Sequence, residues 1–486
     1  MYRLLLYTLL IFVGAAVIFC FFGWLPFKPW DLAISALVLI VVCLISNKIL
    51  GKLFKVPINA ESDYITALIL SLIITPPTVL SGSYFQGLEF LIFAGVVSQA
   101  SKYILSYKGK HFFNPAAFAV VLAAFTISQS ASWWVGTLSM LPLIIIGGLL
   151  IVRKIQRFDL VLSFLLVAIA SITIFSPSRS EFFLISEKIL IDSPILFFSF
   201  IMLTEPFTTP PTRKWRILYG VLIGLIFGPS VHLGSIYSTP ELALILGNIF
   251  SYILSPKVKH LLTFKSKREI GRNTFDFTFE SKDSFSFKPG QYLEFTIANQ
   301  KSDTRGNRRY FTIASSPTEE TLHLGIKYYE NPSTFKKTLS NLNSGEKILA
   351  GNLAGDFVLP KSQAQKLAFI AGGIGITPFR SMIKNLIDRE EKRDIVLFYS
   401  NKSQAEIAYK EIFDQALSFG VRTVYINTDE SGPLTKEKIA QETSDFKDRK
   451  FYLSGPHSMV VAFEKSLKEL GVARTHIKTD FFPGYL

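Results

Sequence analysis

The stretch from Arg308 to Pro317 brings together side chains that could hold a phosphorylated aromatic cofactor. Read as an alternating β-strand, it places Arg309 and Phe311 on one face and Thr312 on the other. A guanidinium can pair with phosphate, an aromatic side chain can contact a ring system, and a hydroxyl can reach a ring nitrogen. The stretch therefore predicts a flavin site, while a basic and aromatic edge strand of a β-barrel is the structural alternative.

Short motifs on both sides of this strand follow one another in an order that favours the flavin. They are Pro289-Gly290-Gln291-Tyr292, Ser333-Thr334-Phe335, Gly355-Asp356-Phe357, Gly372 to Pro378, Ser454-Gly455-Pro456 and the terminal Phe481-Phe482-Pro483-Gly484-Tyr485. This series resembles the ferredoxin-NADP reductase superfamily over about residues 258–486. The resemblance implies an FAD-binding β-barrel at 258–361, an NAD(P)-binding α/β domain at 362–486, and an NAD(P)H-dependent flavin oxidoreductase.

Two of these motifs suit the phosphates of a dinucleotide. Ser333 and Thr334 look like a helix start, where free backbone N–H groups and hydroxyls can hold a pyrophosphate. A buried-type strand at 367–371 runs into Gly372-Gly373-Ile374-Gly375, and Thr377-Pro378 then opens a helix. Glycines let a backbone approach a pyrophosphate that the helix N-terminus faces. An ordinary helix cap and an ordinary glycine turn are the alternatives.

The candidate site residues come from these motifs and from the resemblance. The cofactor-binding candidates are Arg309, Phe311, Thr312, Ser333, Thr334, Gly372, Gly373, Gly375, Thr377, Pro378, Gly455, Pro456, Phe482 and Tyr485. The resemblance places Thr312, Thr377 and Ser454 beside the reacting rings as catalytic candidates, although many members have Cys where Ser454 stands. Lys402 could meet a 2′-phosphate or be solvated, so NADH and NADPH both stay open.

Composition separates the chain into an apolar and a polar part. Of the 486 residues, 49% are hydrophobic; apolar runs continue to about Lys259, and charged residues recur every few positions from His260 onward. We therefore expect a membrane domain at 1–257. The net charge of +14 is not gathered into one basic stripe, which argues against a nucleic-acid partner. The only cysteines, Cys20 and Cys43, lie in apolar runs, which argues against a disulfide framework or an iron–sulfur motif.

The apolar part contains ten candidate membrane spans. They are about residues 4–22, 31–45, 64–74, 88–106, 115–126, 138–152, 159–175, 193–203, 216–227 and 240–254. With the N-terminus inside, nearly all loop Lys and Arg residues fall on the cytoplasmic side, and only Lys28, Arg179 and Lys188 fall outside. We therefore expect a multi-pass protein of the cytoplasmic (inner) membrane, in contact with lipid, whose reductase domain lies in the cytoplasm.

An internal repeat relates the two halves of this membrane domain. Thr75-Pro76-Pro77-Thr78 follows the third span, and Thr209-Pro210-Pro211-Thr212 follows the eighth. Five spans per half would invert the second copy, a 5+5 arrangement. Both spans before these turns are short, so matching irregular backbone points to a buried site, although Pro-Pro also simply ends helices. The membrane-site candidates are Thr75, Thr78, Asn114, Glu205, Thr209 and Thr212.

The membrane part resembles the related membrane subunits of the sodium-translocating NADH:quinone oxidoreductase and of the Rnf electron-transport complex. The matching stretches are His111 to Ala117 and Met202 to Pro206, continued by Thr209 to Thr212. Those subunits carry FMN esterified to Thr in a Ser-Gly-Ala-Thr type motif, which this sequence lacks; Trp133 to Thr137 is the nearest stretch. The resemblance implies a quinone or a non-covalently held flavin as occupant, and other electron-transport proteins as partners.

Two functions follow from this organisation. In the first, NAD(P)H gives a hydride to FAD, and the flavin passes single electrons to an acceptor in or across the membrane. In the second, the membrane domain transports a solute or ion, and the reductase regulates or energises it. Ion-coupled electron transfer lies between the two, but the few intramembrane acids, Glu89 and Glu205, give little support to a multi-carboxylate ion path.

Overall fold

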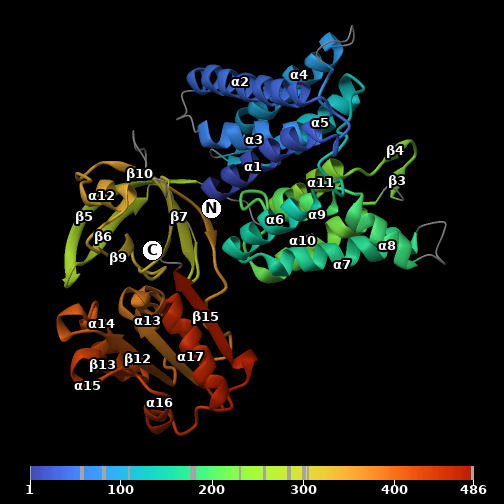
Figure 1. Ribbon diagram of the computed structural model, residues 1–486. Coiled ribbons are helices and arrows are strands. Elements are labelled where there is room, and N and C mark those ends of the chain that lie inside the picture. Colours follow the sequence, from blue (N-terminus) through green and yellow to red (C-terminus); the bar gives the residue numbers. More distant parts are fainter. Residues whose placement is uncertain are drawn as a thin grey trace. The chain divides into compact units, whose positions relative to one another are not determined.

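A computed structural model describes residues 2–54, 60–78, 84–107, 110–175, 182–228, 231–254, 259–281, 286–297, 303 and 306–482, without the side chains of 84–86, 107, 110, 182–186, 481 and 482. Contacts divide the chain into two compact units, Met1–Val258 and Lys259–Leu486. The first unit is helical, and the second combines an antiparallel and a parallel β-sheet (Figure 1).

The helices of the first unit follow the apolar segments of the sequence. They are α1 (Tyr2–Phe21), α2 (Pro29–Leu53), α3 (Ala60–Ile73), α4 (Tyr84–Ile104), α5 (Pro115–Thr126), α6 (Leu141–Ile155), α7 (Phe158–Ile174), α8 (Phe182–Ile191), α9 (Ile195–Phe197), the π-helix η2 (Phe198–Met202), α10 (Arg213–Ile226) and α11 (Pro240–Leu254). Two short hairpins, β1–β2 (Ser106–Tyr107 and Lys110–His111) and β3–β4 (His232–Leu233 and Ile236–Tyr237), complete it. The ten predicted segments all overlap helices, and the sequence did not predict α8.

Length and apolar composition together separate two of these helices from the others. Among the described residues, α1 with 20 residues and α2 with 25 are long and apolar enough to cross a membrane. About 20 residues are needed for a core of roughly 30 Å. The helices α5, α7 and α11 are apolar but shorter. The structure thus has a helical, apolar N-terminal region, and helix length decides neither the ten crossings nor the inverted repeat.

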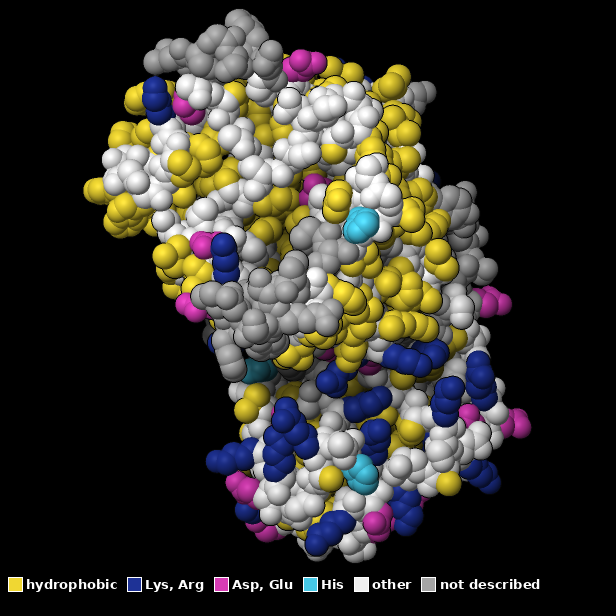
Figure 2. All heavy atoms as spheres, turned by 90° about the vertical axis from the view of Figure 1, so that its right-hand side faces the viewer, with side chains coloured by type: hydrophobic (Ala, Val, Ile, Leu, Met, Phe, Trp, Pro, Cys, Tyr) yellow, Lys and Arg dark blue, Asp and Glu magenta, His cyan; other side chains and the backbone are white. Residues whose placement is uncertain are grey.

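The surface of this unit presents large hydrophobic side chains outward. Ile11, Phe21, Leu37, Ile146 and Leu166 are each more than half exposed, and hydrophobic side chains cover much of the face seen in Figure 2. Contiguous apolar surface of this kind is rare on water-soluble monomers and suits contact with lipid.

Small residues set the close approach of α7 and α10. A side chain at Gly220 would meet the Leu160 carbonyl oxygen at 2.9 Å, and one at Gly224 would meet the Phe164 carbonyl oxygen at 2.9 Å. Glycines four residues apart let helix backbones approach, which is a recurrent device in membrane helices.

The antiparallel sheet of the second unit has the strand order β8-β7-β10-β5-β6-β9. Its strands are β5 (His260–Gly271), β6 (Thr274–Ser281), β7 (Tyr292–Thr296), β8 (Arg308–Thr312), β9 (Leu322–Lys327) and β10 (Lys347–Ala354), with helix α12 (Thr334–Ser340). Alternating residues such as Phe277, Phe279, Phe295 and Ile313 form one buried core inside the curled sheet. We refer to this part as the barrel.

The parallel sheet has the order β13-β12-β11-β14-β15. Its strands are β11 (Leu367–Gly372), β12 (Ile395–Asn401), β13 (Val421–Asn427), β14 (Lys450–Pro456) and β15 (Ile477–Phe482), and its helices are α13 (Thr377–Asp388), α14 (Lys410–Gln415), α15 (Thr428–Ser431), α16 (Lys436–Glu442) and α17 (His457–Glu469). Separate cores lie on its two faces. The strand order reverses between β11 and β14, and ligands of such sheets bind at the carboxyl ends of the strands beside this reversal.

Candidate functional site

Strand β8 places the predicted flavin residues at the edge of the barrel. The Arg309 guanidinium donates to the Gly306 carbonyl oxygen at 3.2 Å and lies 5.5 Å above the Phe335 ring. The Phe311 ring packs on that same Phe335 ring, with 5.8 Å between their centroids. Thr312 is buried opposite Tyr292 of β7. Arg309 and Phe311 thus lie on the face of β8 that packs on Phe335, and Thr312 lies on the opposite face.

Two tyrosines on this edge were not among the predicted site residues. Tyr310 is 39% exposed, and its ring meets that of Tyr292 edge to face at 5.6 Å. A flavin on this face would therefore contact tyrosine rings first. The alternation of the strand already put Tyr310 on the same face as Thr312, which is the signal that could have found it.

The predicted pyrophosphate position lies at the start of α12. The Ser333 hydroxyl accepts from the Lys336 N–H at 3.3 Å, which is an ordinary N-cap contact. The Thr334 N–H donates to Asp303 Oδ2 at 2.9 Å, and the Thr334 hydroxyl accepts from the Asp303 N–H at 3.1 Å. Asp303 therefore occupies the helix start, and a pyrophosphate bound there would have to replace its carboxylate.

The glycine turn after β11 packs closely against the end of β14. A side chain at Gly375 would lie 2.4 Å from the Ser454 carbonyl oxygen, and one at Gly372 would lie 2.3 Å from the Met459 sulfur. Gly373 has a positive φ of 53°, and a side chain there would meet nothing within 4 Å. The turn thus combines two glycines required for packing with one whose free side faces open space.

Ser454 and Thr377 come together at this turn. Thr377 begins α13 with Pro378 next to it, and its hydroxyl donates to the Ile374 carbonyl oxygen at 3.3 Å. The Ser454 hydroxyl is fully buried and has no hydrogen-bond partner among the described residues. A buried hydroxyl usually finds a partner, so this one suits a ligand that brings an acceptor or a donor. Gly455 and Pro456 follow it at the end of β14.

The C-terminal strand lies beside Ser454. In the parallel pairing of β14 with β15, Ser454 is opposite Asp480, Gly455 opposite Phe481 and Pro456 opposite Phe482. Burial raises the pKa of the Asp480 carboxyl to about 6. The side chain of Phe482 and all of Tyr485 lie outside the described residues, so their role as flavin cover stays a prediction.

In the first unit, two of the predicted membrane-site residues, Glu205 and Asn114, are in contact. Asn114 caps α5 by accepting from the Ala117 N–H at 3.0 Å, and its amide donates to Glu205 Oε2 at 2.9 Å. Thr208 also donates to Glu205 Oε2, at 3.2 Å, and His111 Nε2 lies 3.8 Å from Glu205 Oε1. His111 was predicted only as part of the resemblance, and the structure adds it to this cluster.

The two Pro-Pro turns are held differently. The Arg157 guanidinium donates to the Thr209 hydroxyl at 3.3 Å and to the Pro210 carbonyl oxygen at 3.2 Å. Thr212 precedes α10 as its N-cap, without a side-chain cap bond. Near the other turn, the Trp134 indole donates to the Ile74 carbonyl oxygen at 3.1 Å. Thr75 and Thr78 follow α3 in irregular backbone.

A buried carboxylate, that of Glu241, was not among the predicted site residues. Glu241, in the first turn of α11, is 3% exposed and accepts from the Trp133 indole at 2.8 Å. Trp133 has a left-handed φ of 54°, and its N–H donates to the Ile73 carbonyl oxygen at the end of α3. The signal was the proline that opens α5 after Asn114 and α11 after Thr239, because a residue next to each proline makes a polar contact.

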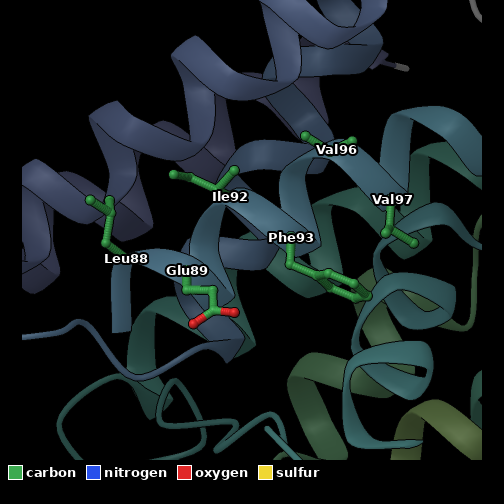
Figure 3. Close-up of a pocket in the computed structure, with 6 residues that line it drawn as sticks. All are labelled: Leu88, Glu89, Ile92, Phe93, Val96 and Val97. Atoms are coloured by element: carbon green, nitrogen blue, oxygen red, sulfur yellow. The ribbon is translucent and has the colours of Figure 1, made fainter. Parts of the chain in front are cut away.

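A pocket on α4 lies apart from these residues. It is lined by Leu88, Glu89, Ile92, Phe93, Val96 and Val97 (Figure 3). Apart from the exposed Glu89 the lining is apolar. None of the predicted membrane-site residues lines it.

Two family models match the chain, one mainly in each unit. Residues 126–261 match the NQR2, RnfD, RnfE family, and residues 369–465 match the oxidoreductase NAD-binding domain. Both resemblances drawn from the sequence are thereby confirmed. The first match and the apolar helices α1 and α2 indicate a membrane protein, and the second match places an oxidoreductase NAD-binding domain in the second unit.

Curated relatives match the reductase part. Flavohemoprotein A of Dictyostelium discoideum is 26% identical over 231 residues, which is 44% of this chain and 58% of that protein. The flavohemoprotein of Candida albicans is 30% identical over 210 residues, 40% of this chain and 51% of that protein. The chain spans about half the length of the curated relatives it matches. They match the same part of the chain as the oxidoreductase NAD-binding domain, which supports an oxidoreductase part in the second unit.

Solved structures match the same part. The FAD/NAD-binding domain of nitric oxide dioxygenase from Vibrio cholerae is 20% identical, with 46% of this chain and 98% of that chain covered and a TM-score of 0.42. Ferredoxin-NADP+ reductase from Plasmodium falciparum with 2′P-AMP is 19% identical, with 46% and 97% covered and a TM-score of 0.40.

Proposed function

We propose that this protein oxidises NAD(P)H through FAD and delivers the electrons to an acceptor in or across the membrane, a quinone or a non-covalently held flavin. The observation that carries the proposal is the reversal of strand order between β11 and β14, where the glycine turn and Thr377 lie beside Ser454. Among the described residues the Ser454 hydroxyl has no hydrogen-bond partner. The β8 edge belongs to the same unit. The family match of residues 126–261 supports a membrane acceptor.

The predicted site residues of the reductase part have defined roles in this proposal. Arg309 and the start of α12 hold the FAD pyrophosphate, and the Thr312 hydroxyl faces the flavin ring. FAD, when bound, accepts two electrons together and releases them singly. The Gly372–Gly375 turn admits the pyrophosphate of NAD(P)H. Thr377 and Ser454 orient the nicotinamide, and the buried sheet end excludes water from it.

The membrane domain takes the electrons in this proposal. We place its limits at residues 1–257, with ten spans in two inverted sets of five and with the FAD-binding part at 258–361 and the NAD(P)-binding part at 362–486. Glu205 and Asn114 form the acceptor site with Thr209 and Thr212, and Thr75 and Thr78 belong to the equivalent turn of the other half. The partly buried Asn114–Glu205 contact supports this, since polar groups in membrane domains mark functional sites.

The test uses the full-length chain, purified with FAD and placed in lipid vesicles. Wild-type protein should oxidise NAD(P)H with a membrane quinone and, separately, with a water-soluble dye. Glu205→Gln and Thr209→Val should lower the quinone rate and spare the dye rate, because the dye needs only the reductase part. Glu187→Gln, which alters an exposed carboxylate on α8, is the matched control and should change neither. Equal loss of both rates in the Glu205 and Thr209 variants would contradict the acceptor site.

Ion or solute transport is the second candidate function. It is favoured by two carboxylates, the partly buried Glu205 and the buried Glu241, each held near the N-terminus of one of the proline-started helices α5 and α11. Carboxylates in a membrane domain can bind and release cations. An ion flux into vesicles that proceeds without NAD(P)H would support transport over electron transfer, and a flux that requires NAD(P)H would support coupling of the two.

A further inference from the structure

We propose that Tyr409 is a positioning residue that fixes the nucleotide-binding turn against the barrel and thereby aligns nicotinamide with flavin. This inference rests on the proposed function for its effect on hydride transfer. Its structural part, a clasp between the barrel and the parallel-sheet part, rests only on contacts inside the second unit. We call the contacts of Tyr409, Asp276, His323, Arg380 and Glu319 the clasp.

The backbone of Tyr409 is held in an unfavourable conformation. Its φ is 58°, in the left-handed region, which bulky residues rarely adopt. The residue is 7% exposed and lies just before α14, where its side chain makes no cap bond to the helix. Such a conformation persists only where the surroundings fix it, and it often marks a functional position. The contacts of its side chain are therefore the place to look for the reason.

The phenol of Tyr409 reaches into the barrel. Its hydroxyl donates to Asp276 Oδ1 of β6 at 3.0 Å, and Asp276 is 4% exposed. Asp276 Oδ2 lies 2.7 Å from Nδ1 of His323 on the neighbouring strand β9, and His323 Nε2 lies 3.0 Å from the Thr321 hydroxyl. Burial raises the pKa of the Tyr409 phenol well above its ordinary value, and the Asp276 carboxylate acts in the same direction. The phenol therefore stays a donor at neutral pH.

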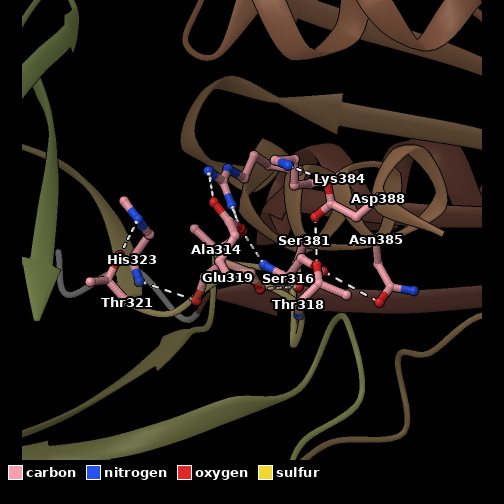
Figure 4. A network of polar contacts seen from close by, with 12 residues as sticks. Ala314, Ser316, Thr318, Glu319, Thr321, His323, Ser381, Lys384, Asn385 and Asp388 are labelled. Carbon is pink, nitrogen blue, oxygen red and sulfur yellow. Dashed lines mark hydrogen bonds and ion pairs between the residues drawn. The ribbon is translucent and has the colours of Figure 1, made fainter. Parts of the chain in front are cut away.

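A cation holds the other side of the tyrosine ring. The Arg380 guanidinium, from α13, lies 5.4 Å from the ring centroid of Tyr409. Its Nη2 donates to Glu319 Oε1 at 2.8 Å, and its Nη1 donates to the Ala314 carbonyl oxygen at 3.0 Å. Glu319 and Ala314 follow the flavin strand β8. Figure 4 shows Ala314 and Glu319, on the barrel side, facing side chains of α13 from the parallel-sheet part.

The segment before Tyr409 is tied to the barrel as well. The Arg272 N–H donates to the Ala405 carbonyl oxygen at 2.8 Å, and Lys327 pairs with Glu406 at 2.8 Å. These contacts join the barrel to the 404–409 segment, which follows the end of β12 where a dinucleotide is expected to lie. Together with the clasp, these two contacts hold the 404–409 segment, which we expect to border the nucleotide site, against the barrel.

One barrel glycine, Gly325, lies against both the clasp and the start of α13. A side chain at Gly325 of β9 would lie 2.8 Å from the Tyr409 hydroxyl oxygen and 2.7 Å from Cγ2 of Thr377. Strand β9 therefore touches Tyr409 and the start of α13 at a single point. Hydride transfer depends steeply on the placement of the two rings, so a small displacement of this turn relative to β8 should slow it.

The test compares Tyr409→Phe with Tyr425→Phe in the full-length chain. Tyr425 also donates a phenolic hydrogen bond to an aspartate, Asp414 Oδ1 at 2.7 Å, but both partners lie within the parallel-sheet part. In cofactor-free protein, Tyr409→Phe should speed amide hydrogen exchange in peptides covering 404–409 and 322–327, and Tyr425→Phe should leave both unchanged. Unchanged exchange in Tyr409→Phe would overturn the clasp whatever the flavin does.

The second arm measures flavin reduction in a single turnover with deuterated and ordinary NAD(P)H. Tyr409→Phe should lower the hydride-transfer rate constant by roughly tenfold to a hundredfold, with FAD content and the NAD(P)H dissociation constant unchanged. An equal rate constant in wild type and Tyr409→Phe would refute the positioning role. Wild-type protein that binds neither FAD nor NAD(P)H would contradict the proposed function instead, and the exchange arm would still decide the clasp.

A second variant guards against simple misfolding. Asp276→Asn keeps the shape of the acceptor side chain but removes its charge, and it should reproduce both effects of Tyr409→Phe. Hydride transfer in the double variant should be no slower than in the slower single variant, because both substitutions affect the same Tyr409–Asp276 hydrogen bond. Additive losses in the double variant would show that the two residues act independently and would overturn the clasp.

Discussion

Single side chains in the reductase part differ in whether the fold already uses them. Arg309 bonds to backbone carbonyls and lies over Phe335, while the Ser454 hydroxyl has no partner among the described residues. Buried polar groups usually have partners, so a site for a ligand is expected where a hydroxyl lacks one. Under the proposed function, the loss of Arg309 should weaken FAD retention, and the loss of a neighbour of Ser454 should weaken nucleotide binding.

The first residue-scale prediction concerns Arg309. Arg309→Ala should weaken FAD retention by about 1.5–3 kcal/mol, the scale of a lost charge-assisted hydrogen bond. The measurement is FAD content after dialysis against a series of free FAD concentrations. Arg422→Ala removes a cation that pairs with Glu442 on the parallel sheet and should leave FAD content unchanged. Equal FAD retention in wild type and Arg309→Ala would remove Arg309 from the site.

A pH dependence follows from Asp480. Its folded pKa of about 6 lies above its ordinary value, so the folded state holds the proton more tightly than the unfolded chain. The unfolding free energy should therefore fall as pH rises from about 4 to about 6 and level off above that. Asp480→Asn removes this loss, so it should raise the Tm above pH 7 and leave it unchanged near pH 4.

Asp445 is the matched control of opposite sign. Hydrogen bonds from Arg449 lower the pKa of its carboxyl to about 2. Its stabilising effect is present above its ordinary pKa and is lost as pH falls toward 2, so Asp445→Asn should lower the Tm at pH 7. Thermal unfolding of both variants across a pH series gives the comparison, and parallel profiles for wild type and Asp480→Asn would contradict the assignment.

Among the elements, the turn between β11 and α13 is where packing and binding can be separated. Gly372 and Gly375 allow the turn to lie against Met459 and β14, whereas Gly373 faces open space. A side chain at Gly375 would force the turn away from β14, while one at Gly373 would meet no atom of the protein within 4 Å. The two positions should therefore respond differently to the same substitution.

This difference gives an element-scale prediction. Gly373→Ala should cost roughly 1–2 kcal/mol through its left-handed backbone and should raise the NAD(P)H dissociation constant while FAD stays bound. Gly375→Ala should lower the Tm further, because its side chain would lie 2.4 Å from the Ser454 carbonyl oxygen. Nucleotide titration and thermal unfolding test both. Wild-type NAD(P)H affinity in Gly373→Ala would exclude this turn as the nucleotide site.

For the whole molecule, the orientation in the membrane decides whether the reductase part can meet cytoplasmic NAD(P)H. The Lys and Arg asymmetry predicts that both termini are cytoplasmic. Reporter fusions after Lys188 should therefore read outside, and fusions after Lys257 inside. The reverse pattern would place the nucleotide site on the wrong side of the membrane for the proposed electron path.

The sequence by itself determined the division into two parts, both family resemblances and most of the elements. Alternating residues specified strands such as β6 and β9, and apolar runs specified the helices, because these patterns reflect neighbours along the chain. Motif order also named Arg309, the glycine turn and Ser454 as candidate site residues, and these stay predictions. It also placed Asn114 and Glu205 in one hypothetical site before any contact between them was visible.

Only the tertiary structure decided which groups share a contact across long stretches of chain. The partners Tyr409 and Asp276 are separated by 133 positions, and Trp133 and Glu241 by 108. Neither pair belongs to a local motif, so no spacing rule could link them. Whether a polar side chain is buried and already has a partner depends on how separate elements pack. For this reason the clasp and the buried contact of Glu241 with Trp133 became visible only in the folded structure.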